Sequence, residues 1–262
     1  MQLNLYQVDA FTTALFGGNP ACVVPLDEWL PDQLLRRIAR ENAVAETAFF
    51  VNQGDQFQLK WFTPEIEMDL CGHATLAAAH VLKSILHYPG EIISFTSNSG
   101  VLEVSCRDGL YTLNFPAREP VPAVLPDVLV RAFDRQPLTV LKSRDYMLVF
   151  ETEEDVRNIQ VNRPVLDQIN LDPGGVIITA PGRKSDFVSR FFTPQSSILE
   201  DPVTGSAHCS LIPYWSKRLG KTALTAIQLS ERIGELACVD MGERVLISGR
   251  ARTYSAGVLW TE

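Results

Sequence analysis

The chain has 262 residues, of which 46% are hydrophobic and 21% charged, a composition typical of one large or two medium globular domains. Its formal net charge of -8 argues against a nucleic-acid surface, because phosphate binding needs clustered Lys and Arg. No apolar run reaches the about 18 residues of a membrane span. The N-terminus lacks a signal-peptide pattern, and the five cysteines are scattered. We therefore expect a cytoplasmic protein that binds neither nucleic acid nor membrane.

The first third of the chain predicts short alternating strands, in the segments LNLYQVDAF, ACVVPL, TAFFVN and FQLKWFTP. An amphipathic helix is expected among them, because four apolar residues fall on one helical face: Leu34, Leu35, Ile38 and Ala39. A helix rich in small residues is expected from about Ala74 to Leu86. Further strands are predicted in IISFTSN, VLEVSCRD and LYTLNFPA.

The proline-rich stretch FPAREPVPAVLP is the best candidate for a connection between domains. Beyond it, strands are predicted in DYMLVFE, GGVIITA and DFVSRFFTP, followed by a helix from about Ser206 to Leu219. Pro213 should kink or break that helix. The last predicted strands are AIQLSER, GELACVD, ERVLISG and YSAGVLW.

Two segments of the chain resemble each other, WFTPEIEMDLCGHATLAAAHVL and RFFTPQSSILEDPVTGSAHCSLIPYW. Cys71 lies 26 residues before Ser97, and Thr204 lies 26 residues before Ser230. The second copy has three extra residues before its helix, where the letters EDP stand. We interpret this as a duplication that gives two pseudo-symmetric α+β domains. The expected boundaries are residues 1–117, completed by a C-terminal strand at about 250–262, and residues 118–249.

Each copy places a glycine at the expected start of a helix, Gly72 in the first and Gly205 in the second. A helix N-terminus carries unsatisfied N–H groups and partial positive charge, so it can bind an anion. Two such N-termini facing one domain cleft would suit a small carboxylate. Alternatively, both glycines only permit tight turns between strand and helix.

Glu46 and Cys71 are candidates for proton transfer. Glu46 precedes an apolar run, and partial burial would raise its pKa toward neutrality; otherwise it is a surface residue at the start of a strand. Cys71 at a helix N-terminus could act as a base or nucleophile, and a buried inert cysteine is equally compatible with the pattern. Cys71 and His73 alone are too few ligands for a structural zinc site, which has about four.

Asp201 lies in the extra triplet before the second helix, next to Glu200. Acidic residues at this place can cap a helix and complement its dipole. Alternatively, Asp201 lies opposite His73 in the cleft and fixes the charge of the imidazole. Ser206 and His208 do not form a nucleophile triad, because residues two apart on a helix do not face each other.

Four segments resemble the PhzF family, the phenazine-biosynthesis-like isomerases: VDAFTTALFGGNPACVV, AETAFF, FTPEIEMDLCGHATLAAAHVL and FFTPQSSILEDPVTGSAHCSLIPYW. The resemblance implies a diaminopimelate epimerase-like fold, in which each domain is a curved, mostly antiparallel sheet or barrel around a central helix. It also implies a homodimeric acid/base isomerase that needs neither cofactor nor metal. By position, Glu46 matches the catalytic acid/base, with His73 and Asp201 as supporting ionisable residues.

The resemblance further places Gly72, Gly205 and Ser206 at the site of the substrate carboxylate, and Asn19 as a residue lining the cleft. Amino-acid epimerases of this fold use two cysteines, one before each central helix. Here Cys71 holds the first position and Thr204 the second, so a single carboxylate, Glu46, is the preferred proton carrier. Two alternatives remain: an epimerase or dehydratase with Cys71 as a base, and a non-catalytic protein that binds a metabolite.

Overall fold

The computed structural model describes residues 1–171 and 174–261. It divides into two compact units, and each is described here by itself. Unit 1 contains Met1–Phe115 and the C-terminal segment from Leu246 onward, whereas unit 2 contains Pro116–Val245. The C-terminal segment belongs to unit 1 because its last strand pairs antiparallel with the first strand of the chain, from Gln2↔Trp260 to Ala10↔Ala251.

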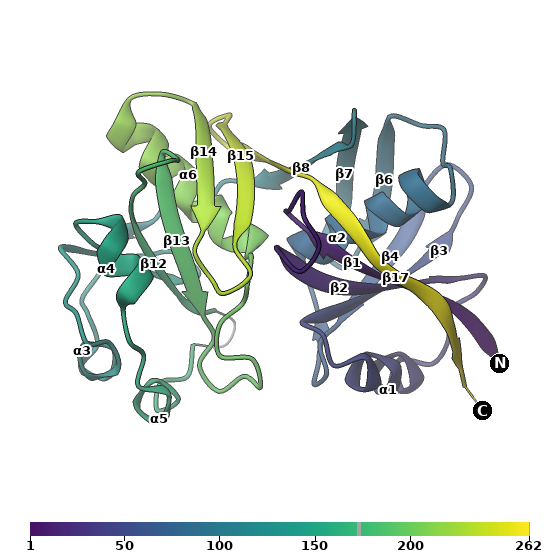
Figure 1. Cartoon of the computed structure of the whole chain (residues 1–262), viewed down its shortest axis with the longest axis horizontal. Coiled ribbons are helices and arrows are strands. Elements are labelled where there is room, and N and C mark those ends of the chain that lie inside the picture. The colour runs from purple at the N-terminus through teal and green to yellow at the C-terminus, as the bar shows by residue number, and fades with distance from the viewer. Residues whose placement is uncertain (172–173, 262) are drawn as a thin grey trace. The chain divides into compact units, whose positions relative to one another are not determined.

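Unit 1 is built from strands around one central helix (Figure 1). Its strands are β1 (Gln2–Ala10), β2 (Asn19–Leu26), β3 (Glu46–Asn52), β4 (Phe57–Phe62), β5 (Glu67–Met68), β6 (Ile92–Ser97), β7 (Gly100–Arg107), β8 (Leu110–Pro116) and β17 (Ala251–Trp260). Its helices are α1 (Asp32–Asn42), α2 (Gly72–His80) and a π-helical continuation of α2 (Val81–Ile85).

The two faces of the unit 1 sheet pack against different helices. Successive side chains of a strand point to opposite faces, so alternate residues of β2 and β3 pack on α1, among them Val24, Phe49 and Val51. The other face contacts α2, all of whose residues are buried. A helix that is apolar on most sides needs such an enclosure, which explains why the small-residue segment lies inside the sheet.

Unit 2 has a sheet with helices on both faces. Its strands are β9 (Val121–Pro122), β10 (Thr139–Lys142), β11 (Tyr146–Val149), β12 (Val176–Pro181), β13 (Phe187–Phe192), β14 (Ala223–Gln228) and β15 (Gly234–Asp240). The boundary between the units falls within β16 (Arg244–Gly249), which belongs to unit 1 from Leu246 onward. Its helices are α3 (Asp127–Ala132), α4 (Glu153–Asn158), α5 (Arg163–Leu166) and α6 (Gly205–Leu219).

The helices α3, α4 and α5 cover one face of this sheet, where Ile178 and Val188 lie in the core. On the other face, α6 packs through Trp215, whose ring stacks on Phe187 at 5.7 Å between centroids. The Trp215 indole also donates to the Thr179 hydroxyl at 3.0 Å. A buried indole N–H needs such an acceptor, so Thr179 fixes how α6 sits on its sheet.

The predicted pseudo-symmetry is confirmed by the order of strand directions. In unit 1, β2 and β3 are parallel, β3 and β4 antiparallel, β4 and β6 parallel, and β6 and β7 antiparallel. In unit 2, the successive pairs among β11, β12, β13, β14 and β15 repeat the same four directions. In both units the central helix precedes the last of these four pairs, α2 before β6 and α6 before β14.

The prediction that Pro213 breaks its helix is wrong, because α6 runs without interruption through Pro213. Proline has no N–H for the carbonyl four residues earlier, that of Cys209. The backbone N–H of Arg118 occupies this carbonyl at 2.8 Å instead. The connecting segment after β8 therefore replaces the missing helical hydrogen bond. The other central helix begins at Gly72, two residues before its predicted start.

Candidate active site

The ionisable cluster of unit 1 forms where β2 and β3 begin and α2 starts. Because β2 and β3 are parallel and Ala21 pairs with Glu46, the first residues of both strands lie at the same edge of the sheet. Glu46 is the first residue of β3, and Asn19 is the first residue of β2. His73, the second residue of α2, lies between them and contacts both.

The side chains of Glu46 and His73 lie close together without forming an aligned hydrogen bond. Their Oε2 and Nε2 atoms are 3.0 Å apart, and the two side chains are 14% and 4% exposed. Both atoms are buried, and neither completes an aligned hydrogen bond to a residue that the structure describes. Catalytic hydrogen bonds are often poorly aligned before substrate binds. The Glu46–His73 pair can therefore accept a proton from a bound ligand.

Cys71 lies on the other side of the imidazole, with its Sγ 3.7 Å from His73 Nδ1. Burial raises the pKa of the Cys71 thiol, and the negative charge of Glu46 raises it further. Burial alone lowers the pKa of His73, but the negative charges of Cys71 and Glu46 outweigh it and hold the pKa above its usual range.

The N-terminus of α2 lies close to this cluster. Cys71 is its N-cap residue, with extended backbone, and its thiol interacts with the backbone N–H of Ala74. The Cys71 carbonyl accepts from the Thr75 hydroxyl at 2.5 Å. The start of the helix, at Gly72 and His73, carries the partial positive charge that favours an anion.

In unit 2, the N-terminus of α6 carries the remaining predicted residues. Gly205 and Ser206 are the first two residues of α6, and Thr204 is its N-cap. The Thr204 hydroxyl donates to the Asp201 carboxylate at 2.5 Å, so Asp201 orders the turn before the helix. The Thr204 side chain itself makes no capping hydrogen bond to α6.

Gln228 is a buried residue of this site that sequence reasoning missed. Its side chain donates to the Asp201 carbonyl at 2.7 Å and accepts from the Thr204 N–H at 2.9 Å. It is fully buried at the end of β14, 24 residues beyond Thr204. A single glutamine in an otherwise ordinary strand gives no signal in the sequence, because its partners are defined only by the fold.

Three other polar residues near the motifs have structural partners. Glu200 forms a two-pronged ion pair with Arg190, at 2.7 and 2.8 Å. His80 contacts the Tyr111 hydroxyl and the Thr253 hydroxyl, at 3.0 and 2.9 Å. His208 binds the Thr204 carbonyl through Nδ1 at 2.8 Å. These contacts give all three residues a structural role within their own units.

The cluster of Glu46, Cys71 and His73 is also the group that could hold a metal ion, since its ligand atoms lie within 4.8 Å of one another. Structural zinc sites use four protein ligands, and catalytic ones use three with an open position. Nothing in the geometry requires an ion, because Glu46 and His73 already form an acid–base pair.

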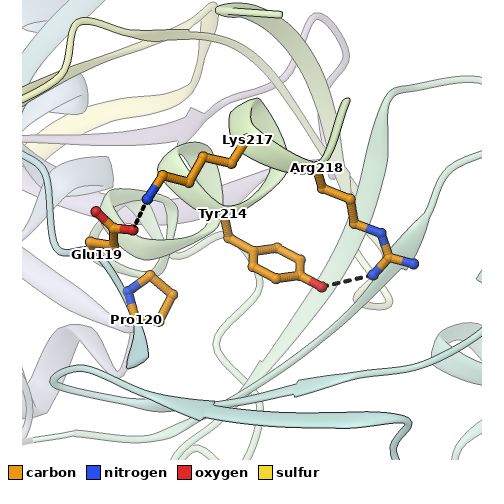
Figure 2. A pocket seen from close by; sticks show the side chains of 5 residues that line it. All are labelled: Glu119, Pro120, Tyr214, Lys217 and Arg218. Carbon is orange, nitrogen blue, oxygen red and sulfur yellow. Dashed lines mark hydrogen bonds and ion pairs between the residues drawn. The ribbon is translucent and has the colours of Figure 1, made fainter. Parts of the chain in front are cut away.

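Unit 2 also has a surface pocket of about 420 Å³, which contains none of the predicted site residues (Figure 2). It is lined by Glu119, Pro120, Tyr214, Lys217 and Arg218. Lys217 pairs with Glu119, and Arg218 donates to the Tyr214 hydroxyl at 2.7 Å, so its charged groups already have partners. Tyr214 lies ten residues after Thr204, which is about 15 Å along the helix. This pocket is therefore distinct from the N-terminal site.

Comparison with known proteins identifies the family. The family model described as "Phenazine biosynthesis-like protein" matches residues 8–257. The chain belongs to the PhzC-PhzF family. An uncharacterized isomerase of Pseudomonas aeruginosa is 50% identical over 258 residues, which cover 98% of each chain. The crystal structure of a PhzF-family protein from Enterococcus faecalis is 44% identical, with a TM-score of 0.95 and complete coverage of both chains.

The comparisons confirm that this PhzF-family chain is an isomerase-type enzyme with the predicted α+β fold. The fold extends to a hydroxyproline epimerase of Agrobacterium vitis, solved with bound trans-4-hydroxy-L-proline. That structure has a TM-score of 0.64 and 10% identity, and covers 98% of this chain and 92% of its own, so the likeness concerns the fold alone. Among the described residues, no helix is both long and apolar enough to cross a membrane.

Proposed function

We propose that this PhzF-family protein shifts a proton, and with it a double bond, within a small cyclic or amino-acid-like carboxylate. The observation that carries the proposal is the contact between Glu46 Oε2 and His73 Nε2, at 3.0 Å and without an aligned hydrogen bond. A carboxylate beside an imidazole, mostly buried but reachable at its 14% exposed edge, fits general acid–base catalysis.

The proposed reaction is a proton transfer within one molecule. The Glu46 carboxylate removes a proton from one carbon of the substrate. The electron pair of that C–H bond forms a new double bond while the existing double bond moves, and Glu46 returns the proton to a second carbon. Electrons and atoms balance within the substrate, so the proposal requires no cofactor. His73 stabilises the carboxylate of Glu46 before the first transfer and again after the second, while Glu46 carries the substrate proton in between.

We propose that the helix N-termini supply the donors for the substrate carboxylate. In unit 1 these are the N–H groups beginning at Gly72, and in unit 2 those beginning at Gly205 and Ser206. The location of these glycines at helix N-termini supports this role, because the N–H groups and partial positive charge of a helix start favour an anion. Asp201 would act through Thr204, whose hydroxyl it accepts, by keeping the α6 N-terminus ordered.

The test is turnover in deuterium oxide. A panel of cyclic and amino-acid-like carboxylates, including trans-4-hydroxy-L-proline, is screened for thermal stabilisation of the protein and then for deuterium uptake by mass spectrometry. For any compound that is converted, Glu46→Gln should lower turnover by about 10²–10⁴-fold while the stabilisation by ligand persists. Glu41→Gln, which changes an exposed residue of α1, is the matched control. Full turnover by Glu46→Gln would refute the proposed role.

A second candidate is an epimerase or dehydratase in which Cys71 is one of the bases. The position of its Sγ beside His73, at 3.7 Å, favours this candidate, whereas the raised pKa of the buried thiol opposes it. Solvent deuterium exchange that is lost in Cys71→Ser and kept in Glu46→Gln would favour the epimerase. A non-catalytic metabolite-binding protein would show stabilisation by a ligand without exchange at any of its carbons.

A further inference from the structure

Asn19 contacts His73 on the side of the ring that faces away from Glu46. Its side-chain Nδ2 lies 3.0 Å from His73 Nδ1, and both residues are buried. The backbone before it is fixed, because Gly18 has φ +64° and a Cβ at Gly18 would lie 2.1 Å from the Ala10 carbonyl oxygen. Only glycine fits such a close approach, so the start of β2 holds Asn19 at one place.

The chemistry of an amide determines where the imidazole proton must be. An amide nitrogen is only a donor, so the Nδ1 atom that it contacts must offer a lone pair. A neutral imidazole then carries its proton on Nε2, which is the atom that faces Glu46 Oε2. The titratable groups that act on His73 are Glu46, from β3, and Cys71, from the start of α2. The weakly donating thiol lies farther from Nδ1, at 3.7 Å.

We propose that Asn19 is a positioning residue that donates to Nδ1 of His73 and fixes the neutral imidazole as the Nε2–H tautomer, with the ring proton on the nitrogen next to Glu46. Asn19 thereby differs from a residue that merely lines the substrate site. Its effect on turnover rests on the proposed function of Glu46, whereas the tautomer itself does not. The two can therefore fail separately.

The direct test is the tautomer of His73 in the full chain without ligand, measured by ¹⁵N–¹H correlation of the imidazole rings at a pH above the raised pKa of His73, where the ring is neutral. The chain has four histidines, which makes assignment by single substitution practical. His208 is an internal reference, because its Nδ1 contacts a carbonyl at 2.8 Å and must carry the proton. We expect His73 to show the opposite pattern, with the proton on Nε2. An Nδ1–H tautomer in the wild type would overturn the proposal.

Substitution of Asn19 should move the proton. In Asn19→Asp, the nearly isosteric carboxylate can only accept, so His73 should change to a form that carries a proton on Nδ1. The Asn19→Ala variant tests the proposal if the aspartate variant does not fold. Its side chain has no donor for Nδ1 of His73, so the imidazolium form of His73 should persist to a pH about one unit higher than in the wild type. An unchanged tautomer and titration of His73 in a folded Asn19→Ala variant would contradict the proposal.

Turnover provides the second readout. Replacing a residue that orients a metal-binding histidine typically changes metal affinity or activity by about 10–100-fold. By analogy we expect a loss of this size in kcat for Asn19→Asp, with a smaller change in KM. A retained Nε2–H tautomer together with full turnover by Glu46→Gln would refute the acid–base proposal and leave the role of Asn19 intact. A changed tautomer in Asn19→Asp with wild-type kcat at neutral pH would show that the tautomer is unimportant for turnover and overturn the catalytic part of the inference.

Discussion

Replacing His208 with Gln should make the stability of the protein less sensitive to acid. His208 is fully buried beside Phe187, and its Nδ1–H donates to the Thr204 carbonyl at 2.8 Å. Burial lowers its pKa to about 4 from the ordinary 6.5, although the bond to Thr204 acts in the opposite direction. A glutamine amide can also donate to a helix carbonyl, but it does not titrate in this range.

The change in the free energy of unfolding with pH follows from the linkage between proton binding and folding. Between pH 6.5 and 4 the unfolded chain binds a proton at His208 that the folded protein does not bind. The stabilisation is therefore complete above pH 6.5 and is lost as pH falls toward 4. The full difference corresponds to about 3 kcal/mol, of which about 2 kcal/mol is lost between pH 7 and pH 5.

The assay is urea unfolding followed by tryptophan fluorescence at pH 7 and pH 5, for the wild type and each variant. Comparing the pH 7 to pH 5 losses removes the contributions of other groups, such as His80, whose pKa is lowered to about 4 by burial and then by Arg252. His208→Gln should lose about 2 kcal/mol less than the wild type over this range. His87→Gln, at an exposed position, should match the wild type. An equal loss in His208→Gln and wild type would refute the reasoning.

Two further predictions concern thiol reactivity and assembly. Cys71 is 6% exposed and burial raises its pKa, so iodoacetamide at pH 7.5 should alkylate it at least about tenfold more slowly than free glutathione, as measured by peptide mass spectrometry; rapid native-state alkylation would contradict this. We also expect a homodimer: Val258 and Trp260 lie on one face of β17 and are 36% and 75% exposed, so Trp260→Ser should weaken the dimer in light scattering. A wild-type monomer throughout the micromolar range would contradict that expectation.

Elements with a strong local pattern could be predicted from the sequence. The face of α1 is an example, because Leu35, Ile38 and Ala39 are buried in the structure and Leu34 packs against the same core. The enclosure of α2 followed from its small apolar residues, which leave no polar face to point at water. The pseudo-symmetry of the fold could also be predicted. The equal spacing from the N-cap of each central helix to a recurring serine reflects the same order of strands in both units.

Contacts between distant segments could not be predicted in this way. Asn19 and His73 are 54 residues apart and meet because α2 packs against β2. The uninterrupted helix through Pro213 depends on Arg118, whose N–H replaces the bond that proline cannot make. In both examples the residue itself can be read from the sequence. Its partner lies in a distant element, which a local sequence pattern cannot identify.

The two copies of the repeat have different chemistry at equivalent helix starts, and this difference limits the mechanism. The N-cap of α2 is Cys71, whose thiol is buried and has a raised pKa. The N-cap of α6 is Thr204, whose hydroxyl is already donated to Asp201 at 2.5 Å. A hydroxyl held in this way is a poor base, so a pair of equivalent thiols is not available to exchange protons on opposite faces of a substrate. Glu46 instead combines a buried, incompletely bonded oxygen with a neighbouring imidazole, which is what repeated proton transfer by one group requires.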